Sequence, residues 1–408
     1  MNVCIIGGGA SGMMVAILLS QKGCNVTIFE KNAELGKKIL ITGKGRCNVT
    51  NFCSNDEFLA NVVRGKKFLI SSLQAFPPQK TIDFFESCGV KLKTERGNRV
   101  FPLSDSASTI KNALLQKLKQ NNVKILTNCS VNAIFAKGKR FIAIESNGTK
   151  YTFDACVVAT GGLSYKTTGS TGDGYNFASK MGHKIIDLVP ALNGIETKQS
   201  VKQLEGLALK NVVVKAIDKE KVVYSSEIGE MIFTNVGVSG PIVLSMSSYI
   251  NRINVDDISI DLKPALSYQQ LETRIDMEIE QNNKKTLISL LSTLLPKRLI
   301  DEFVIRLEVN RDTKLNQISR AKRQKLVALL KDFRLQFKCV EPIDYAVITS
   351  GGVSTDEINP KDMQSKLISG LFFVGEVLDV DALTGGFNLQ IAFMTANACA
   401  NSKFFEEV

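Results

Sequence analysis

Residues 3–12 read VCIIGGGASG, a short apolar run followed directly by a glycine-rich turn. An apolar run of this kind is typical of a buried parallel strand, and residues 13–21 after the turn have helical composition. We interpret the stretch as the strand, turn and helix of a dinucleotide-binding site. Gly7 then permits the tight turn, Gly9 lets the backbone approach a pyrophosphate, and Gly12 lets the helix pack closely against the strand.

A second apolar strand is expected at residues 25–29, directly before Glu30. A carboxylate at this position would accept hydrogen bonds from the adenosine ribose and would repel a 2′-phosphate. The glycine pattern by itself also fits a turn without a ligand, and it does not distinguish FAD from NAD. The flanking strands and Glu30 together favour a bound dinucleotide.

Two later segments distinguish between these cofactors. Residues 155–162 are expected to form a strand that runs into Thr160-Gly161-Gly162, and residues 370–376 another buried strand with an acidic end. The second is followed by GGFNLQ (385–390) and an apolar helical stretch to residue 400. An extended cofactor needs a second contact region for its ribityl chain and flavin, and a helix amino terminus can stabilise charge at N1 and O2 of a reduced flavin. Three such turns in one chain favour FAD.

The most specific stretch is GKKILITGKGRCNVTN (36–51), which occurs together with TSGGV (349–353) and GEVLDVDALTGGFNLQIA (375–392). With these motifs the chain resembles, essentially from end to end, the family of FAD-dependent oxidoreductases named for a bile-acid reductase and a ribosomal-RNA dihydrouridine synthase. Members of that family are also described as aminoacetone-oxidase-like flavoproteins. The resemblance implies noncovalent FAD and an α/β fold, in which a Rossmann-like FAD-binding domain is split by an inserted β-barrel plus helical domain.

The resemblance also implies which residues contact the cofactor. The pyrophosphate turn would comprise Gly7, Gly9, Ala10, Ser11 and Gly12, and the adenosine site would comprise Glu30, Lys31 and Val131. The loop beside the ribityl chain and flavin would contain Lys38, Thr42, Gly43, Arg46 and Asn48. The site would be completed by Thr160, Gly161, Gly375, Glu376, Gly386, Asn388 and Leu389. Glu376 stands where many relatives of the wider fold carry Asp, and its longer carboxylate can still accept a hydroxyl.

The hydrophobic pattern changes in the middle of the chain. Residues 193–264 contain short β-rich runs, including 211–217 and 258–261, which predict a small barrel or sandwich. Residues 265–338 have a helical period, with candidate helices at 286–295, 299–309 and 320–333. The FAD-type pattern covers residues 1–192 and resumes at 339–408, so an insertion of a usual domain size splits the nucleotide domain.

Length and composition exclude several classes of protein. The chain has 408 residues, of which 44% are hydrophobic and 22% are charged, so it is neither a disordered chain nor a coiled coil. Nine cysteines, none of them in a CxxC pair, favour reduced thiols and no structural metal. No apolar run approaches the ~20 residues of a membrane helix, and the amino terminus lacks a basic region before its glycines. We therefore expect a cytoplasmic protein without a membrane partner, of unspecified oligomeric state.

The formal charge of +11 is unevenly distributed. Residues 1–190 carry 25 basic and 12 acidic groups, residues 191–340 carry 23 and 18, and residues 341–408 carry 3 and 10. Residues 319–338 alone contain seven basic groups and one acid. One interpretation is a solvated helix face that balances acidic surface elsewhere, and the other is a phosphate-contacting surface for structured ribosomal RNA. The absence of Trp and the 7% aromatic content argue against base stacking on single strands.

Proton chemistry must rely little on histidine, because His183 is the only one and lies outside these motifs. We expect it to be structural or solvent-exposed. Cys47 is a candidate proton donor, since Arg46 beside it favours a thiolate and reduction of a C=C bond at a flavin needs a proton as well as a hydride. The alternative is a small buried residue that packs the loop. Arg46 could bind an oxyanion, as could Lys37 and Lys38, which otherwise form a solvated pair.

The leading hypothesis is an FAD-dependent oxidoreductase that takes hydride from NAD(P)H and passes it to an unsaturated acceptor. No second glycine fingerprint follows a strand, so the nicotinamide would bind transiently. The alternatives are uridine in ribosomal RNA as the acceptor, an aminoacetone-type amine oxidase that uses oxygen, and a flavin-binding protein with little turnover. Fold and cofactor do not separate these hypotheses.

Overall fold

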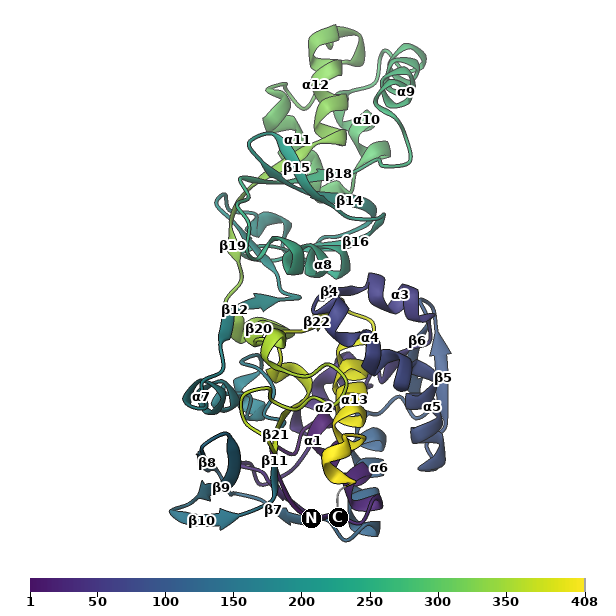
Figure 1. Ribbon diagram of the computed structural model, residues 1–408. Helices are drawn as coiled ribbons and strands as arrows, with labels where there is room; N and C mark the ends of the chain where they lie inside the picture. Colours follow the sequence, from purple (N-terminus) through teal and green to yellow (C-terminus); the bar gives the residue numbers. More distant parts are fainter. Residues whose placement is uncertain (407–408) are drawn as a thin grey trace. The chain divides into compact units, whose positions relative to one another are not determined.

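Figure 1 shows the computed structural model, which describes residues 1–406. The chain divides into two compact units. The first comprises Met1–Ala191 and the segment from Pro342 onward, and the second comprises Leu192–Glu341. The second unit begins one residue before and ends three residues after the insertion expected at 193–338, because strand β19 (Phe333–Val340) pairs with strands of this unit.

The first unit is built on a five-stranded parallel sheet. Its strands are β1 (Asn2–Ile6), β2 (Asn25–Phe29), β7 (Lys124–Leu126), β11 (Ala155–Val158) and β21 (Leu371–Phe373). They lie in the order β21-β11-β1-β2-β7, and all neighbouring pairs are parallel. The central strands are apolar and buried, as expected for strands covered on both faces. The sheet confirms the Rossmann-like α/β fold, and it places β21, which follows the insertion in sequence, beside β11.

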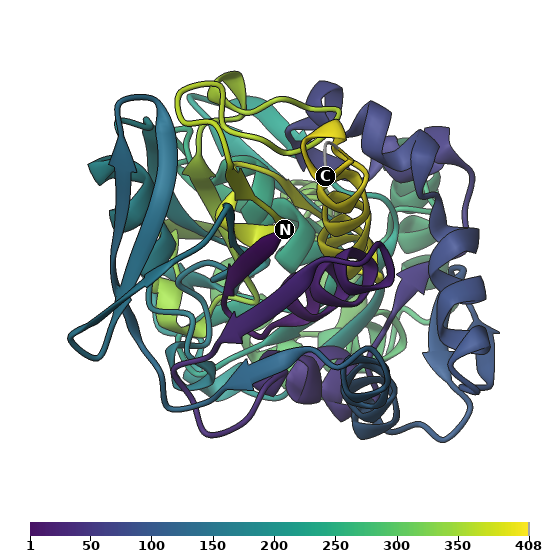
Figure 2. The same ribbon diagram turned by 60° about the horizontal axis from the view of Figure 1, so that its bottom comes forward.

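Two buried helices from opposite ends of the chain pack side by side, α1 (Ala10–Gln21) and α13 (Phe387–Ala400) (Figure 2). Buried residues surround most of each helix, which explains why neither sequence has a polar stripe. The amphipathic helix α6 (Ala107–Gln120) packs against α1. The other helices of this unit are α2 (Lys37–Ile41), α3 (Asn55–Ala60), α4 (Lys66–Ala75), α5 (Pro78–Ser87) and α7 (Asp173–Lys180).

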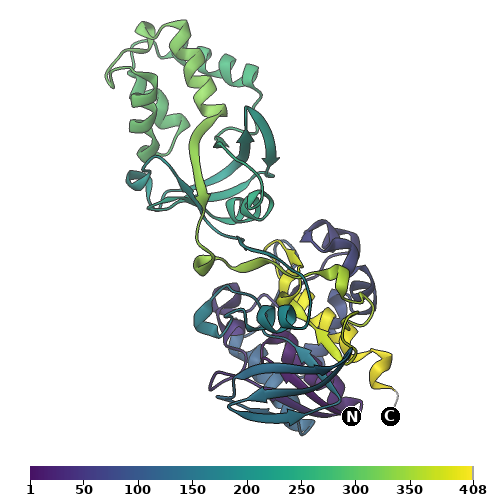
Figure 3. The same cartoon turned by 60° about the vertical axis from the view of Figure 1, so that its left-hand side comes forward.

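Smaller antiparallel sheets carry the sequence motifs. The strands β3 (Thr50–Asn51), β6 (Arg99–Pro102) and β5 (Leu92–Glu95) form one of them. Two-stranded pairs are formed by β12 (Ile185–Ala191) with β20 (Ile348–Val353), and by β4 (Val62–Arg64) with β22 (Asp381–Ala382). A three-stranded sheet contains β8 (Val131–Lys137), β9 (Arg140–Ser146) and β10 (Thr149–Thr152) (Figure 3). Strands β3, β20 and β22 belong to the three motif segments, so these pairings hold the motifs in place.

The second unit contains a closed β structure. Its strands are β13 (Ile195–Thr197), β14 (Ala208–Asp218), β15 (Lys221–Ser225), β16 (Gly229–Phe233), β17 (Gly237–Ser239), β18 (Asp257–Asp261) and β19. The order is β15-β14-β16-β17-β13-β19-β18, and an additional pairing of β14 with β18 closes the ring from β14 to β18. Six strands therefore form a barrel, with β15 attached to β14 as an outer strand. Helix α8 (Pro241–Ile250) packs on β14 and β16.

The remaining helices gather at one end of the second unit (Figure 3). They are α9 (Tyr268–Gln281), α10 (Leu287–Leu294), α11 (Ile300–Leu307) and α12 (Arg320–Lys331). The helix expected at 320–333 ends at Lys331, because Phe333 is buried as the first residue of β19. Each unit has its own apolar core. Among residues 1–406, no helix is both long and apolar enough to span a membrane.

Candidate functional site

The glycine turn after β1 has the backbone that the motif requires. Gly7 has a left-handed φ of 102°, and a Cβ there would lie 2.6 Å from the Ala159 carbonyl oxygen. A Cβ on Gly12 would lie 1.9 Å from the Gly7 carbonyl oxygen, so only glycine permits this packing. A Cβ on Gly9 would meet nothing within 4 Å. Gly7 and Gly12 are therefore required by the fold, whereas Gly9 faces open space that a ligand could fill.

The turn leaves backbone donors for an anion. Helix α1 has no side-chain cap, and its first intrahelical bond is from the Met13 N–H to the Gly9 carbonyl at 2.9 Å. The N–H groups of Ala10, Ser11 and Gly12 precede that bond and have no helical carbonyl to pair with. A helix amino terminus with such donors suits a pyrophosphate.

Glu30 lies directly beside this turn, at the end of β2, and is only 7% exposed. One carboxylate oxygen accepts the Gly8 N–H at 2.8 Å, and the other accepts the backbone and side-chain N–H groups of Asn32 at 2.9 and 2.7 Å. These bonds fix the carboxylate against the turn. Glu30 therefore stabilises the turn, in addition to its expected role as the ribose ligand. The sequence did not indicate this stabilising role.

The other two expected adenosine residues lie at the same edge of the sheet. Lys31 extends its ammonium to Asp173 of α7 at 2.7 Å, so its charge is already paired. Val131 begins β8 and is buried. Two residues before it lies Cys129, whose N–H donates to the Glu30 carbonyl at 3.0 Å. Strand β2 and the start of β8 are thereby held together where the resemblance places the adenine.

The motif after the insertion meets the amino-terminal turn directly. Gly375 has a left-handed φ of 75°, and a Cβ there would lie 2.7 Å from the Ser11 hydroxyl oxygen. The Gly375 N–H donates to Thr395 of α13 at 3.0 Å. Two of the expected cofactor residues, Ser11 and Gly375, are thus neighbours although 364 positions separate them.

Lys38 and Glu376 form an ion pair that also binds neighbouring polar groups. The Lys38 ammonium lies 2.8 Å from a Glu376 carboxylate oxygen and 2.7 Å from the Ser164 hydroxyl. The other Glu376 oxygen accepts the Thr349 N–H at 3.0 Å. Ser164 and Thr349 were not identified from the sequence, although Thr349 lies within the TSGGV motif. The group ties the loop at 36–51 to the 375–377 turn.

The segment after β11 carries an unsatisfied hydroxyl. The Thr160 Oγ1 atom is buried and has no hydrogen-bond partner among the described residues. Gly161 has a φ of 72°, and a Cβ on Gly162 would lie 2.5 Å from the Thr349 hydroxyl. This turn is therefore packed against β20.

The flavin-side loop after α2 is built from left-handed residues. Gly43, Lys44, Gly45 and Cys47 have φ between 55° and 83°. Two of them are not glycine, and such a backbone is unfavourable unless its surroundings impose it. A Cβ on Gly43 would lie 2.8 Å from the Asn48 nitrogen, and the Asn48 side-chain oxygen is buried without a partner in residues 1–406. Thr42 turns its hydroxyl to the Ile39 carbonyl at 2.6 Å.

Arg46 is already paired with two carboxylates and is not free to bind an oxyanion. Its guanidinium lies 2.7 Å from Glu95 and 3.1 Å from Asp105, and over the ring of Phe101 at 4.0 Å. The hydrogen bond with Glu95 raises the pKa of Arg46 and lowers that of Glu95. Lys93 adds a second cation at 2.6 Å from Asp105. Arg46 therefore anchors the loop to β5 and β6, and a role in binding an oxyanion would require it to exchange partners.

Cys47 does not have the expected thiolate character. Its side chain is fully buried, and burial raises the pKa of the thiol to about 12. The neighbouring guanidinium of Arg46 faces Glu95 and Asp105, so it does not stabilise a thiolate at Cys47. Burial therefore favours the second of the two interpretations, that Cys47 packs the loop.

The third glycine turn leads into α13. Gly386 caps this helix with a φ of 97°, and no side chain caps it. The first intrahelical bond runs from the Gln390 N–H to the Gly386 carbonyl at 3.1 Å, so the N–H groups of Phe387, Asn388 and Leu389 precede it. The Asn388 side chain is used within the turn, since its amide donates to the Ala382 carbonyl at 2.7 Å. Contacts from residues 388 and 389 to a cofactor would therefore involve the backbone.

These features fit FAD. Open space at Gly9 and two helix amino termini provide donors for the pyrophosphate and for the flavin carbonyl. The buried, unpaired oxygens of Asn48 and Thr160 require partners, which a cofactor or ordered water would supply. The sequence identified most of these positions but missed Ser164, Thr349 and the buried Gln390 of α13.

His183 is structural and buried. Its Nε2 lies 2.8 Å from the Ser365 hydroxyl oxygen and its Nδ1 lies 3.2 Å from Glu357. The same hydroxyl oxygen accepts the N–H groups of Leu367 and Ile368 at 3.0 and 2.9 Å. The hydroxyl thus donates to Nε2, and Nδ1–H donates to Glu357. Although Ser, His and Glu stand in line as in a hydrolase triad, the Ser365 oxygen is saturated and buried, which makes it a poor nucleophile.

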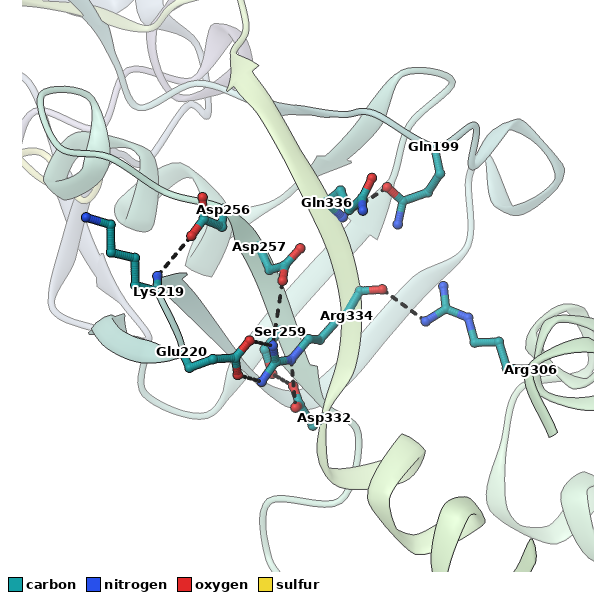
Figure 4. Close-up of polar contacts among 10 residues, drawn as sticks. All are labelled: Gln199, Lys219, Glu220, Asp256, Asp257, Ser259, Arg306, Asp332, Arg334 and Gln336. Atoms are coloured by element: carbon teal, nitrogen blue, oxygen red, sulfur yellow. Dashed lines mark hydrogen bonds and ion pairs between the residues drawn. The ribbon is translucent and has the colours of Figure 1, made fainter.

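The basic segment 319–338 is largely neutralised. Lys322 and Lys325 pair with Glu308, Arg323 with Asp276, Lys331 with Asp261, and Lys338 with Glu196. Arg334 lies between Glu220, Asp332 and Asp257 at 2.8, 2.9 and 3.6 Å (Figure 4). Within residues 1–406, Arg320 is the one basic group of the segment without an ion pair. The arrangement supports the charge-balancing interpretation of this segment.

Comparison with known proteins gives a consistent result. Residues 1–402 match the family model described as the HI0933-like protein Rossmann domain. The chain is 30% identical over 400 residues to the 3-dehydro-bile acid delta(4,6)-reductase of Clostridium scindens, covering 96% of each chain. It is 31% identical over 400 residues to the ribosomal RNA dihydrouridine synthase of Escherichia coli, covering 97% of this chain and 96% of the relative.

A solved structure confirms the fold. A variant of E. coli quinol fumarate reductase aligns with a TM-score of 0.51 and 14% sequence identity. The alignment covers 99% of this chain and 70% of the reductase chain. At this identity the likeness concerns the fold alone.

Proposed function

Because this chain belongs to the HI0933-like Rossmann-domain family of FAD-dependent oxidoreductases, we propose that it reduces a carbon–carbon double bond conjugated to a carbonyl group, with hydride that comes from NAD(P)H. The proposal is supported chiefly by the end-to-end similarity to two kinds of reductase. A 3-dehydro bile acid with a Δ4 double bond is an enone, and uracil has its C5=C6 bond conjugated to C4=O. Both named activities therefore share one acceptor class.

Reduction of such an acceptor adds a hydride to the β carbon and a proton to the α carbon. FAD, when bound, supplies the two-electron step by accepting hydride from the nicotinamide and releasing it to the acceptor. The protein would hold the pyrophosphate at residues 9–12, the ribose at Glu30, and the ribityl chain beside Lys38 and Glu376. The first-turn N–H groups of α13 would stabilise negative charge on the flavin pyrimidine ring.

The proton source must be a group other than the lone histidine. His183 is committed to Ser365 and Glu357, and burial lowers its pKa. Cys47 is a neutral thiol that could donate only if the loop opened, because its side chain is fully buried. The remaining candidate sources are water and an Arg, Lys, Tyr or carboxyl group.

The experiment begins with the cofactor of the purified protein. Denaturation should release FAD, identified by its mass, and anaerobic NADH or NADPH should bleach the flavin band of the holoprotein faster than it reduces free FAD. A 4-en-3-one steroid or 2-cyclohexenone should then restore the band, whereas cyclohexanone, which lacks the double bond, should not. Release of another cofactor, or a flavin that both nucleotides leave oxidised, would overturn the proposal.

Uridine in ribosomal RNA is a second candidate acceptor, favoured by the similarity to the E. coli and Haemophilus influenzae ribosomal RNA dihydrouridine synthases. Because the charge of segment 319–338 is largely paired, RNA phosphates would have to contact the basic excess of residues 1–190 instead. Deleting the gene should remove one dihydrouridine from ribosomal RNA, as read by mass mapping. An unchanged dihydrouridine content in the deletion strain would exclude this acceptor.

A further inference from the structure

Gln390 is a fully buried amide in the first turn of α13 whose hydrogen bonds reach two other elements. Its side-chain oxygen accepts the hydroxyl of Thr50 in β3 at 2.8 Å and the hydroxyl of Thr81 in α5 at 2.6 Å. Its side-chain nitrogen donates to the Phe76 carbonyl at 2.9 Å. Thr50 and Thr81 are themselves fully buried. One side chain thus joins the amino end of α13 to β3, to α5 and to the residues before α5.

The chemistry of these partners requires an amide at position 390. The Phe76 carbonyl can only accept, and it fixes the nitrogen of Gln390 on its own side. The oxygen then faces two hydroxyls, of Thr50 and Thr81, and accepts a hydrogen bond from each. A carboxylate would place an acceptor oxygen against the Phe76 carbonyl oxygen, which is repulsive. An apolar side chain would leave three buried polar groups without a partner.

The backbone at the same end of α13 packs directly against the backbone of β3. A Cβ on Gly386 would lie 2.5 Å from the Thr50 carbonyl oxygen, so the two segments touch directly. Asn51 donates to the Gly385 carbonyl at 3.0 Å and to the Gly97 carbonyl at the same distance. Strand β3 follows the loop of residues 42–48 immediately. The helix end and this loop are therefore held as one body.

We infer that Gln390 is a positioning residue that holds the first-turn N–H groups of α13 in a fixed place relative to the loop at 42–51, and that it thereby sets the reduction potential of the bound flavin. This inference rests on the proposed flavin site. A fixed helix end stabilises negative charge on a reduced cofactor without rearrangement. A mobile helix end stabilises that charge less, because ordering it costs free energy. Gln390 acts through the backbone and need not touch the cofactor.

The test compares Gln390→Met with Thr50→Val, Thr81→Val and a matched control, Phe393→Leu. Phe393 is buried in the same helix and contacts Phe85 of α5, so its truncation destabilises the same packing without touching the polar bonds. Gln390→Met and Thr50→Val should lower the equilibrium constant for two-electron reduction of the bound flavin roughly fivefold. This corresponds to a shift of its reduction potential by about 20 mV to a more negative value. Thr81→Val should have a smaller effect, because Thr81 lies on the side of α5 and not of the loop.

Amide hydrogen exchange of the peptide covering residues 383–392 provides a readout that does not depend on flavin. Exchange there should speed up in Gln390→Met and Thr50→Val but not in Phe393→Leu. An equal potential shift in Phe393→Leu, or unchanged potential and exchange in Gln390→Met, would overturn the inference. If the purified protein binds no flavin, the proposed function fails, and the exchange measurement alone decides whether Gln390 positions the helix.

Discussion

Substituting Gly9 by Ala should separate folding from cofactor binding. Gly9 has an extended backbone (φ −77°, ψ −168°) that alanine also adopts, and the added Cβ meets nothing within 4 Å. Alanine is a poorer helix cap than glycine but reduces the entropy of the unfolded chain, so the free energy of unfolding of the apoprotein should change by less than about 1 kcal/mol. The fold should therefore tolerate the change.

The same methyl group should weaken FAD binding strongly. It would occupy the open space at Gly9 where we propose that the pyrophosphate approaches the N–H groups of residues 10–12, so at least one charge-assisted hydrogen bond should be lost. A bond of that type contributes about 1.5–3 kcal/mol, which corresponds to roughly a 10- to 150-fold increase in the dissociation constant.

Quenching of flavin fluorescence during titration of the apoprotein measures this constant, and urea unfolding of the same sample measures stability. Gly12→Ala is the matched contrast, because its Cβ would lie 1.9 Å from the Gly7 carbonyl oxygen and should prevent folding of the turn itself. Wild-type affinity in Gly9→Ala would refute the placement of the pyrophosphate at this turn. A large loss of apoprotein stability in Gly9→Ala would refute the view that the space is open.

Three further changes test other parts of the site. Lys38→Met should raise the FAD dissociation constant about tenfold by removing the cation that pairs with Glu376, whereas Lys37→Met, whose ammonium donates to Asn32 at 3.3 Å, should not. Cys47→Ala should leave turnover at saturating acceptor within about twofold while the melting temperature falls by about 2–4 °C, and a more than tenfold loss of turnover would identify the thiol as a participant. Burial lowers the pKa of His183 in the folded state, so the folded protein binds a proton less readily than the unfolded chain. As the pH decreases below about 6.5, the free energy of unfolding should therefore decrease, by at most about 1.4 kcal/mol per pH unit. Urea titrations from pH 7.5 to 5 should show that component in the wild type and not in His183→Gln, and equal slopes would contradict it.

The sequence predicts structure formed by neighbouring residues well, but it does not predict ion pairs between residues far apart in the chain. The roles of Gly7 and Gly12 follow from neighbouring residues, since strand, turn and helix are contiguous, and the structure reproduces them. The state of Arg46 depends on Glu95 and Asp105, about 50 positions away, and no periodicity indicates that they will neutralise it. A charged neighbour in sequence was therefore a poor guide to the state of Cys47.

The same limit applies outside the cofactor site. Segment 319–338 has a clear excess of basic residues, but its partners come from separate strands and helices that the fold brings to it. His183 finds Glu357 and Ser365 on the other side of the insertion, so its burial is a property of the assembled unit. Residues whose function is set by such distant neighbours require the tertiary structure.

The position of β21 in the parallel sheet imposes an order on synthesis. The ribosome makes β1, β2, β7 and β11 first, then the whole insertion, and only afterwards the strand that covers the free edge of β11. The insertion has its own apolar core and can complete it while that edge is still uncovered. The nascent chain thus carries an exposed, apolar strand edge for the 212 residues of translation between β11 and β21. Gly375 and α13 emerge last, so the nucleotide pocket cannot close around a cofactor until the polypeptide is nearly finished.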